Sequence, residues 1–322
     1  MKRALVTGAN GFVASHLARA LLERGDTVTA LDRPGSEAAG LELQGISAQV
    51  ELVAGDLRDA ELVGATVGSG QYDVVFHLAA QTIVGRAMED PGATLDTNVR
   101  GTWTVLEACR RAEVPAVVVA SSDKAYGPAP ELPYREEMAL RPASPYEASK
   151  AAADVIALSY RPAFGLPVAV TRFANVYGGG DLNFSRLIPE AVTAVLDGRR
   201  PVIRSDGSPQ RDFLYVDDAV SAYLAIEHAV GAGGPAAGEA FNAGGEQPHS
   251  VAKVLELIGA VAGTGIEPEI QGVGNPSGEI DRQFVDSTKL RKTTGWRPRV
   301  ELRDGLVRTV EWYREHPEAR HG

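Results

Sequence analysis

The sequence has little of several residue types on which other classes of protein depend. It holds one cysteine, Cys109, so an intrachain disulfide is excluded and secretion has no support. Its six histidines show no spacing typical of metal ligands, so a metal centre has no support either. No stretch approaches the roughly 20 consecutive apolar residues that cross a membrane. We therefore expect neither a metal site nor a membrane span.

Basic residues are also in deficit. The chain carries 32 lysines and arginines against 42 aspartates and glutamates, a formal net charge of −10. A nucleic-acid surface needs a basic stripe, so no nucleic-acid partner is expected. The apolar run after the charged start M-K-R breaks at Gly8, too early for a secretory signal. With 44% hydrophobic residues among 322, the chain can bury a large core, and we expect a cytoplasmic globular protein.

A glycine-rich turn follows the first predicted strand, residues 4–7. Gly8 and Gly11 fit the first two glycines of a nucleotide-binding fingerprint, and residues 12–22 continue with helical periodicity. Glycines at such a turn let backbone amides approach a pyrophosphate at the start of a helix. Ala14 stands where the fingerprint has its third glycine, a position that serves close packing of helix against strand.

The second predicted strand, residues 27–31, ends in Asp32, about twenty residues beyond the turn. A carboxylate there can hold a ribose 2′-hydroxyl and would repel a 2′-phosphate, an effect that Arg33 could soften. The sequence therefore favours NAD over NADP as the cofactor. A plain turn or surface role for Asp32 is the alternative.

Two further strand ends add candidates for the same cofactor pocket. Residues 50–53 lead to Asp56, which could accept a hydrogen bond from the adenine amino group. Residues 74–78 lead to Ala79, Ala80 and Gln81, where small side chains would let the chain pass close to a cofactor. The alternatives are a helix N-cap for the carboxylate and simple packing for the alanines.

The stretch with the strongest chemical signal follows the apolar run at residues 117–119, which predicts a strand buried on both faces. Polar residues that include Ser122, Asp123 and Lys124 come where that strand would end, and ligands bind at the carboxyl ends of parallel strands. Tyr146 and Lys150 share one face of a helix that begins near Tyr146. An ammonium beside a phenol favours the phenolate, a base for neutral pH. The alternative is a solvated surface pair.

Strand–helix alternation continues through at least five units, with a long helix at residues 94–112 and a sixth strand at residues 168–172. This alternation predicts an α/β fold, a Rossmann doubly wound parallel sheet with a smaller C-terminal α/β part. Asn98 and Cys109 lie on the long helix, where they suggest core or interface residues. Later segments alternate less regularly, and residues 231–238 suggest a flexible surface loop. Converging arginines suit a diphosphate, although each alone could be a surface charge; the candidates are Arg186, Arg204, Arg211 and Arg282.

Several motifs together resemble the extended short-chain dehydrogenase/reductase family over residues 2–313. They are G-A-N-G-F-V-A, Asp32, G-D-L, H-L-A-A-Q, Y-E-A-S-K, R-F-A-N-V-Y-G and R-D-F-L-Y-V-D-D. The resemblance implies a domain at residues 1–174 that holds NAD and a part at residues 175–322 that binds a nucleoside diphosphate sugar. D-K after the catalytic serine and N-V-Y-G-G-G-D before R-L-I-P look most like CDP-glucose 4,6-dehydratases. D-K also resembles the C5-inverting UDP-N-acetylglucosamine dehydratases.

The same resemblance assigns roles to individual residues, and it implies a homodimer formed through the helices at residues 94–112 and 146–161. Catalytic roles fall to Ser122, Asp123, Lys124, Tyr146 and Lys150. Cofactor-binding roles fall to Gly8, Asn10, Gly11, Phe12, Val13, Asp32, Arg33, Asp56, Leu57, Leu78, Ala79, Ala80, Gln81, Asn98, Tyr146 and Lys150. Substrate-binding roles fall to Ser122, Asn175, Arg186, Leu187, Arg204, Arg211 and Arg282. The departures from the family pattern are Ala14, Ser122 in place of threonine, and the epimerase-like R-D-F-L-Y-V-D-D.

Three functions remain open at this point. In a nucleotide-sugar 4,6-dehydratase, Tyr146 takes the proton of the sugar 4-hydroxyl as the C4 hydride passes to NAD, after which Asp123 and Lys124 serve as acid at C6 and base at C5. A 4-epimerase oxidises C4 in the same way but needs no such pair. A non-catalytic NAD-binding regulator would have no reason to keep Ser122, Tyr146 and Lys150 together. We expect the dehydratase, with the epimerase as the alternative.

Overall fold

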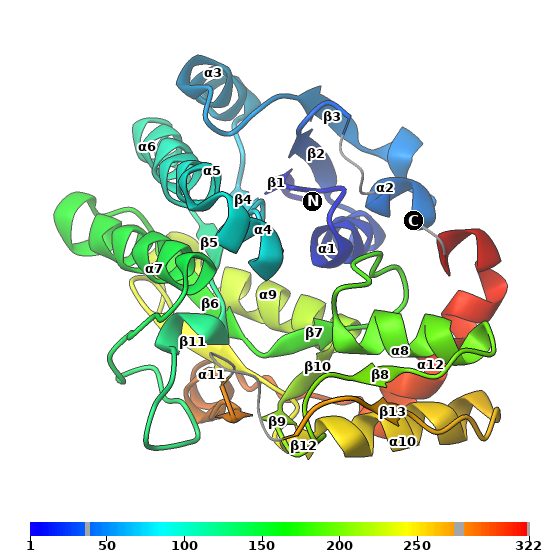
Figure 1. Cartoon of the computed structure of the whole chain (residues 1–322). Helices are drawn as coiled ribbons and strands as arrows, with labels where there is room; N and C mark the ends of the chain where they lie inside the picture. The colour runs from blue at the N-terminus through cyan, green and yellow to red at the C-terminus, as the bar shows by residue number, and fades with distance from the viewer. Residues whose placement is uncertain (36–38, 274–279, 321–322) are drawn as a thin grey trace.

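The computed structural model describes residues 1–35, 39–273 and 280–320, and a seven-stranded parallel sheet forms its centre (Figure 1). The strand order is β3-β2-β1-β4-β5-β6-β11. The strands are β1 (Arg3–Thr7), β2 (Thr27–Asp32), β3 (Glu51–Ala54), β4 (Val74–His77), β5 (Val117–Ala120), β6 (Val168–Phe173) and β11 (Ala240–Ala243). The predicted doubly wound α/β sheet is confirmed. Because all the strands are parallel, their carboxyl ends meet along one edge, where ligands bind in such folds.

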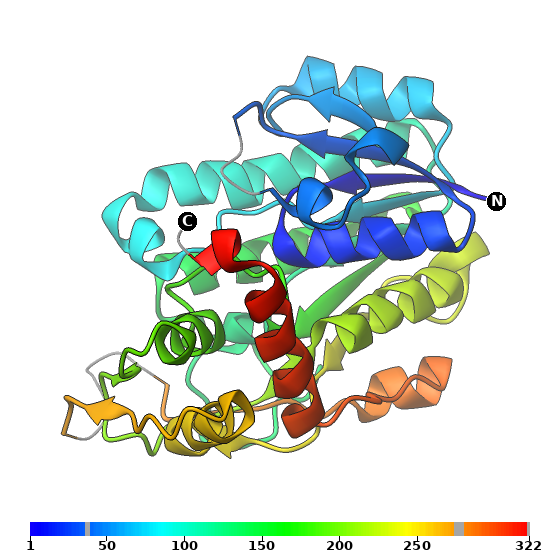
Figure 2. The same cartoon turned by 90° about the vertical axis from the view of Figure 1, so that its right-hand side faces the viewer.

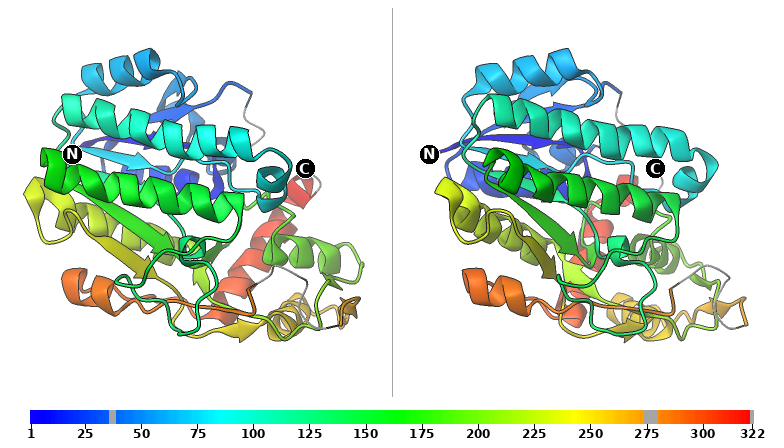
Figure 3. Two further views of the ribbon diagram at one scale, coloured as in Figure 1. Left: turned by 60° about the vertical axis from the view of Figure 1, so that its left-hand side comes forward. Right: turned by 90° about the vertical axis from the view of Figure 1, so that its left-hand side faces the viewer.

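Helices cover both faces of the sheet (Figures 1 and 3). Alternate residues of a strand point to opposite faces, so Val6 packs into the core with helices α1 and α9, whereas Leu5 packs with α3, α6 and α7. The helices on the first face are α1 (Phe12–Glu23), α9 (Val216–Val230) and α11 (Thr288–Thr294). Those on the second face are α3 (Ala60–Gly70), α5 (Pro91–Leu95), α6 (Gly101–Arg111) and α7 (Pro145–Phe164).

The long helix predicted for residues 94–112 is interrupted. The structure has α5, then the π-helical turn η2 (Asp96–Arg100), then α6. In that turn the Gly101 N–H donates to Asp96 O, a span of five residues rather than four. A π-turn inserts one residue into a helix and often occurs at functional sites. Periodicity alone could not place it, because one extra residue only shifts the apolar stripe.

The second half of the chain builds smaller sheets below the carboxyl edge of the large one (Figure 2). The pairs are β7 (Asn175–Tyr177) with β10 (Phe213–Tyr215) and β8 (Val202–Ile203) with β13 (Glu269–Ile270), and a three-stranded sheet joins β12 (His249–Ser250), β9 (Gln210–Arg211) and β14 (Arg282–Gln283). The hydrophobic core of this C-terminal part is enclosed by helices α8 (Leu187–Leu196), α10 (Val251–Ala262) and α12 (Leu302–Glu315). The chain also returns to the large sheet as α9, β11 and α11. The boundary predicted at residue 174 stays a prediction.

The segment 231–238 is held more firmly than its glycines suggested. It begins with the 3-10 turn η4 (Gly231–Gly233), Ala236 is fully buried, and the Gly238 N–H donates to Val168 O at 2.7 Å. The segment is thus anchored where it leads into β11, while most of its described residues are at least partly exposed, and its flexibility stays a prediction. The remaining short elements are α2 (Gly40–Leu43), α4 (Val84–Glu89), η1 (Ser47–Gln49), η3 (Asp123–Tyr126) and η5 (Pro317–Arg320).

Neither a membrane span nor a metal cluster is found in the described ranges. None of the helices in residues 1–35, 39–273 and 280–320 is long and apolar enough to cross a bilayer. In the same ranges, no three His, Cys, Asp or Glu side chains are grouped as metal ligands.

Candidate functional site

The glycine turn after β1 is built around a close approach of two segments. Gly8 has φ +69°, and a Cβ at this position would lie 2.7 Å from Ala79 Cα. Any other residue at position 8 would therefore meet both backbone strain and a steric clash. The Gly11 N–H donates to Gly8 O at 2.8 Å, which closes the turn. Ala79 owes its small size to this packing.

Helix α1 begins at this turn in a form suited to an anion. Its N-cap is Gly11, and within the described chain no side chain caps it, so the first-turn amides of Phe12 and Val13 face the turn without a side-chain acceptor. Helix N-termini of this kind bind phosphate. The Phe12 ring lies edge-on to His16 at 5.4 Å and packs against the core of the C-terminal part. Ala14 is buried in the core, so its methyl group is accommodated.

Asp32 holds the turn from the next strand. Its carboxylate accepts hydrogen bonds from Asn10 N and from Arg33 N, both at 2.8 Å, and remains partly exposed. A carboxylate so placed still has lone pairs for ribose hydroxyls. The residues present therefore fit the adenosine diphosphate half of a dinucleotide.

Asp56 and Leu57 have partners within the protein. Asp56 accepts from Arg58 Nη2 at 2.7 Å and from Arg58 N at 2.9 Å, and the Arg58 guanidinium lowers the pKa of the carboxyl. Leu57 is buried in the core beside Gly101. Contact of Asp56 with adenine stays a prediction, and Leu57 has only its backbone to offer a cofactor.

The loop after β4 is fixed by a residue from the π-turn. Asn98 Oδ1 accepts from Gln81 N at 2.7 Å, while Asn98 Nδ2 donates to Gln81 O and to Ser149 Oγ, each at 2.9 Å. Leu78, Ala79 and Ala80 are half-buried on this loop. Asn98 thus fixes the conformation of the loop that follows β4. Its expected direct contact with the cofactor stays a prediction.

Helix α7 begins with a capping box that places Tyr146 in its first turn. Ser144 Oγ accepts from Glu147 N, the Glu147 carboxylate accepts from Ser144 N, and Pro145 occupies the first helical position. Lys150 lies one turn later, and its Nζ donates to Ala120 O at 2.8 Å, at the end of β5. Both side chains are buried.

Burial controls the proton affinities of this pair. It raises the pKa of Tyr146 to about 12, against opposing effects of Arg186 and of a hydrogen bond with Ser122. Burial also lowers the pKa of Lys150 to about 8. The expectation that the Lys150 ammonium gives Tyr146 a pKa near neutral is therefore not met. Desolvation of the phenolate outweighs the neighbouring positive charges.

Ser122, Asp123 and Lys124 form a tight turn directly after β5. Ser122 Oγ donates to Asp123 Oδ1 at 3.2 Å and accepts from Lys124 N at the same distance. Asp123 is fully buried, its Oδ2 has no hydrogen-bond partner among the residues that the structure describes, and desolvation raises its pKa. Lys124 Nζ lies 3.8 Å from the carboxylate and donates to Asn175 Oδ1 at 2.9 Å.

The predicted substrate residues divide into those that act on Tyr146 or Asp123 and those that lie further along the C-terminal part. Arg186 stands close enough to Tyr146 to favour its phenolate and pairs with Asp181 at 2.9 Å, and Leu187 begins helix α8 beside it. Arg211 also acts on Asp123 electrostatically, and Arg282 lies on the strand paired with β9. Arg204 is exposed, just after β8. Arg186 and Arg211 are thus the two arginines that act on Tyr146 and on the turn at residues 122–124 (the catalytic turn of the sequence prediction).

Two contributors escaped the sequence analysis. Ser149 accepts from Asn98 and donates to Tyr146 O at 2.7 Å, so it joins two site elements. Asp212 is a buried carboxylate that accepts from Gly245 N, and desolvation raises its pKa to about 7. Both residues lie within motifs that the sequence analysis quoted: Ser149 is the serine of Y-E-A-S-K, and Asp212 follows Arg211 in R-D-F-L-Y-V-D-D.

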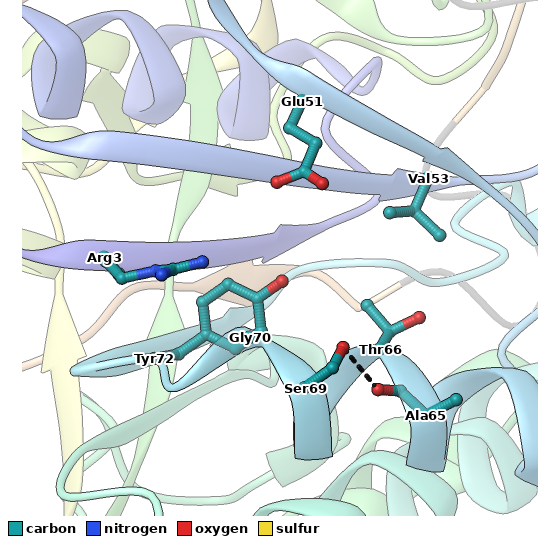
Figure 4. A pocket seen from close by; sticks show the side chains of 8 residues that line it. All are labelled: Arg3, Glu51, Val53, Ala65, Thr66, Ser69, Gly70 and Tyr72. Atoms are coloured by element: carbon teal, nitrogen blue, oxygen red, sulfur yellow. Dashed lines mark hydrogen bonds between the residues drawn. The ribbon is translucent and has the colours of Figure 1, made fainter.

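A separate depression of about 300 Å³ lies at the opposite edge of the sheet (Figure 4). It is lined from the starts of β1 and β3 and from the end of α3, by Arg3, Glu51, Val53, Ala65, Thr66, Ser69, Gly70 and Tyr72. The hydroxyls of Thr66 and Ser69 donate to carbonyls of their own helix. The catalytic turn follows the carboxyl end of β5, so this depression is not part of the site.

Comparisons with known proteins agree with this geometry. The profile of the NAD dependent epimerase/dehydratase family matches residues 4–244. The chain is 38% identical to a UDP-glucose 4-epimerase of Mycolicibacterium smegmatis, covering 97% of this chain and 98% of the relative. It is also 38% identical to a dTDP-glucose 4,6-dehydratase of Streptomyces griseus, covering 97% and 94%.

A solved structure extends the agreement to three dimensions. The dTDP-glucose 4,6-dehydratase of Streptomyces venezuelae, solved with NAD bound, superposes with a TM-score of 0.88 at 32% identity and covers 98% of each chain. The predicted resemblance and the NAD cofactor are thereby confirmed. This chain belongs to the NAD dependent epimerase/dehydratase family, within the extended short-chain dehydrogenase/reductase fold.

Proposed function

We propose that the protein is an NAD-dependent nucleotide-sugar 4,6-dehydratase. The observation that carries the proposal is the Asp123–Lys124 pair beside Ser122, in which a fully buried carboxyl keeps one oxygen without a partner in the described chain. Removal of water across C5 and C6 requires an acid and a base close to the oxidised sugar. Relatives named dTDP-glucose 4,6-dehydratase give further support.

The first step rests on residues of α7 and the catalytic turn. Tyr146, hydrogen-bonded with Ser122, takes the proton of the sugar 4-hydroxyl. Lys150 lies one helical turn away and keeps its ammonium against Ala120 O, where its charge favours the phenolate. NAD, when bound, accepts the C4 hydride and later returns it at C6.

The elimination assigns one role to each member of the pair. A 4-ketone acidifies the C5 hydrogen, and the Lys124 amine is the base that removes it. Asp123 donates a proton to the leaving C6 hydroxyl, a role that fits a carboxyl whose pKa is raised by burial. The neighbouring Lys124 ammonium opposes that rise. Asp123 as the acid and Lys124 as the base are the productive pair.

The substrate we propose is a nucleoside diphosphate sugar. Arg186 acts electrostatically on Tyr146, and Arg211 acts electrostatically on Asp123, so both place positive charge near these residues. Guanidinium groups bind diphosphates through paired hydrogen bonds. Arg282 lies on β14, which pairs with the strand that holds Arg211.

A nucleotide-sugar 4-epimerase is the second candidate. A relative with that name is as similar as the dehydratase, and Arg211 belongs to the epimerase-like R-D-F-L-Y-V-D-D. An epimerase oxidises C4 with Tyr146, turns the ketone and takes the hydride back on the other face. It has no use for an acid and a base at C6 and C5.

A panel of nucleotide sugars separates the two reactions by product mass. Loss of one water identifies a dehydratase, whereas an isomer of unchanged mass identifies an epimerase.

The variant Lys124→Ala tests the assigned base. We expect dehydration to fall by ~10²–10⁴-fold, because a general base supplies about that much rate. Bound NADH should accumulate, and deuterium incorporation from solvent at C5 should fall in parallel. Lys253→Ala is the matched control, since Lys253 pairs with Glu256 on α10 away from the site. Near-normal turnover of Lys124→Ala would favour the epimerase.

A further inference from the structure

A buried histidine stands at the centre of the sheet, between the cofactor turn and the catalytic helix. His77 ends β4 and pairs in register with Thr7 of β1. Its Nδ1 lies 2.8 Å from Thr7 Oγ1 and its Nε2 lies 2.9 Å from Thr102 Oγ1. The exposed fraction of its side chain is 2%, so each ring nitrogen depends on these partners.

The hydrogen bonds around His77 admit one direction. Thr102 Oγ1 lies 2.6 Å from Asn98 O and must donate to it, because a carbonyl cannot donate. Thr102 then accepts from His77 Nε2–H, which leaves Nδ1 as the acceptor for the Thr7 hydroxyl. Thr7 Oγ1 in turn accepts from Ala79 N at 3.3 Å. Every donor and acceptor in the chain is used once in its proper sense.

The series of hydrogen bonds continues beyond His77 to Tyr146. Asn98, whose carbonyl receives the Thr102 hydroxyl, donates its amide to Ser149 Oγ, and Ser149 donates to Tyr146 O. Ala79 at the other end packs against Gly8 in the cofactor turn. A continuous path therefore joins the glycine turn to the first turn of α7. It consists of packing between Gly8 and Ala79, of hydrogen bonds from Ala79 N to Asn98 O and from Asn98 Nδ2 to Tyr146 O, and of the Asn98 residue that joins the two sets.

We propose that His77 is a positioning residue, which through Thr102 and Asn98 fixes the cofactor turn relative to Tyr146. The proposal requires only bound NAD and Tyr146, which the dehydratase and the epimerase share. A change of about 1 Å between reacting groups costs as much as 10²-fold in rate, so a rigid link between the two segments bears directly on turnover.

The neutral form of His77 is essential to this role. An imidazolium would present a second donor to Thr7 Oγ1 and leave no acceptor for its hydroxyl proton. Burial lowers the pKa of His77 to about 3, and the nearby Lys150 ammonium acts in the same direction. His77 is therefore neutral, and the link intact, at neutral pH.

A matched pair of threonine variants tests the link without touching substrate or cofactor. Thr102→Val removes the hydroxyl that joins His77 to Asn98. Thr104→Val is the control, because Thr104 is also buried on α6 and donates to Arg100 O at 2.9 Å but has no bond to His77. Each variant loses one hydroxyl bonded to the carbonyl four residues earlier.

We expect Thr102→Val to lower kcat ~10-fold or more while KM for the nucleotide sugar stays within about twofold. Amide exchange at Ala79 and Gln81 should accelerate in the same variant, a readout that needs no substrate. Thr104→Val should keep the wild-type kcat and exchange rates. Equal kcat and equal exchange in the two variants would overturn the proposal.

His77 itself provides the second test. His77→Gln keeps an acceptor and a donor on one amide, whereas His77→Phe removes both. We expect the glutamine variant to recover most of the kcat that phenylalanine loses. Equal losses in the two variants, with the threonine pair also alike, would show that His77 only fills space.

Discussion

Single residues of the site differ from their surface counterparts mainly through burial. Tyr146, Lys150 and Asp123 are each withdrawn from water, and in each the charged form is penalised. The penalty raises the pKa of the tyrosine and of the carboxyl, and it lowers the pKa of the lysine. Positive charges from Arg186 and Lys124 oppose this effect on Tyr146 and Asp123, respectively. Opposing effects of burial and of neighbouring charge on pKa are typical of sites for acid–base chemistry.

Titration of Lys150 should make turnover decline at alkaline pH. Its pKa is lowered to about 8, so the side chain is charged below that pH and neutral above it. Since the charge favours the Tyr146 phenolate, we expect turnover to decline as pH rises through about 8. Arginine does not titrate in this range. Lys150→Arg should therefore lose the decline in a pH profile of kcat, and an unchanged decline would assign it to another group.

At the scale of elements, the strand–turn–helix unit from β5 to α7 could be predicted from the sequence, whereas the π-helical turn η2 could not. The run at residues 117–119 and the S-P-Y-E start of α7 carry local signals for a buried strand and a capped helix. The π-turn carries none, although it places Asn98 against Gln81 and Ser149. Asp123 and Lys124 were recognised from their position, but the Lys124–Asn175 contact depends on β7, a strand of three residues.

The capping box of α7 should affect both stability and turnover. Ser144→Ala removes an N-cap, which costs about 1 kcal/mol of unfolding free energy. Because Tyr146 lies in the first turn, the same change should lower kcat.

Ser250→Ala is the matched control, since Ser250 caps α10 through Lys253 N far from the catalytic turn. Denaturant unfolding should give similar losses for the two variants, and only Ser144→Ala should lose turnover. Equal kcat values would show that fraying at the cap does not reach Tyr146.

On the scale of the whole molecule, one face carries an unusual number of exposed apolar side chains. Helices α6 and α7 lie side by side on that face (Figure 3). The exposed residues there are Leu95 at 41%, Trp103 at 47%, Val155 at 60% and Phe164 at 58%. Large exposed apolar patches usually mark an interface, and these four side chains are the candidates for one. A second copy of the chain, related by a twofold axis, would cover it with the same four residues.

We therefore predict a homodimer, with a mass twice the 34.0 kDa of one chain in light scattering at micromolar concentration. Val155→Asp places a charge in the centre of the apolar face and should yield the monomer. Leu52→Asp, on the exposed edge strand β3, should leave the dimer intact. A wild-type protein at the mass of one chain would refute the prediction.

The return of the chain to its first sheet has a consequence for synthesis. Strand β11 pairs with β6 through partners such as Ala240 and Val170, so the large sheet lacks its last strand until the C-terminal part has been largely translated. Until then β6, buried along its whole length in the finished protein, presents a bare hydrogen-bonding edge on the nascent chain. A fragment that ends soon after residue 174 would expose this edge, and we expect it to aggregate rather than to fold as a nucleotide-binding domain.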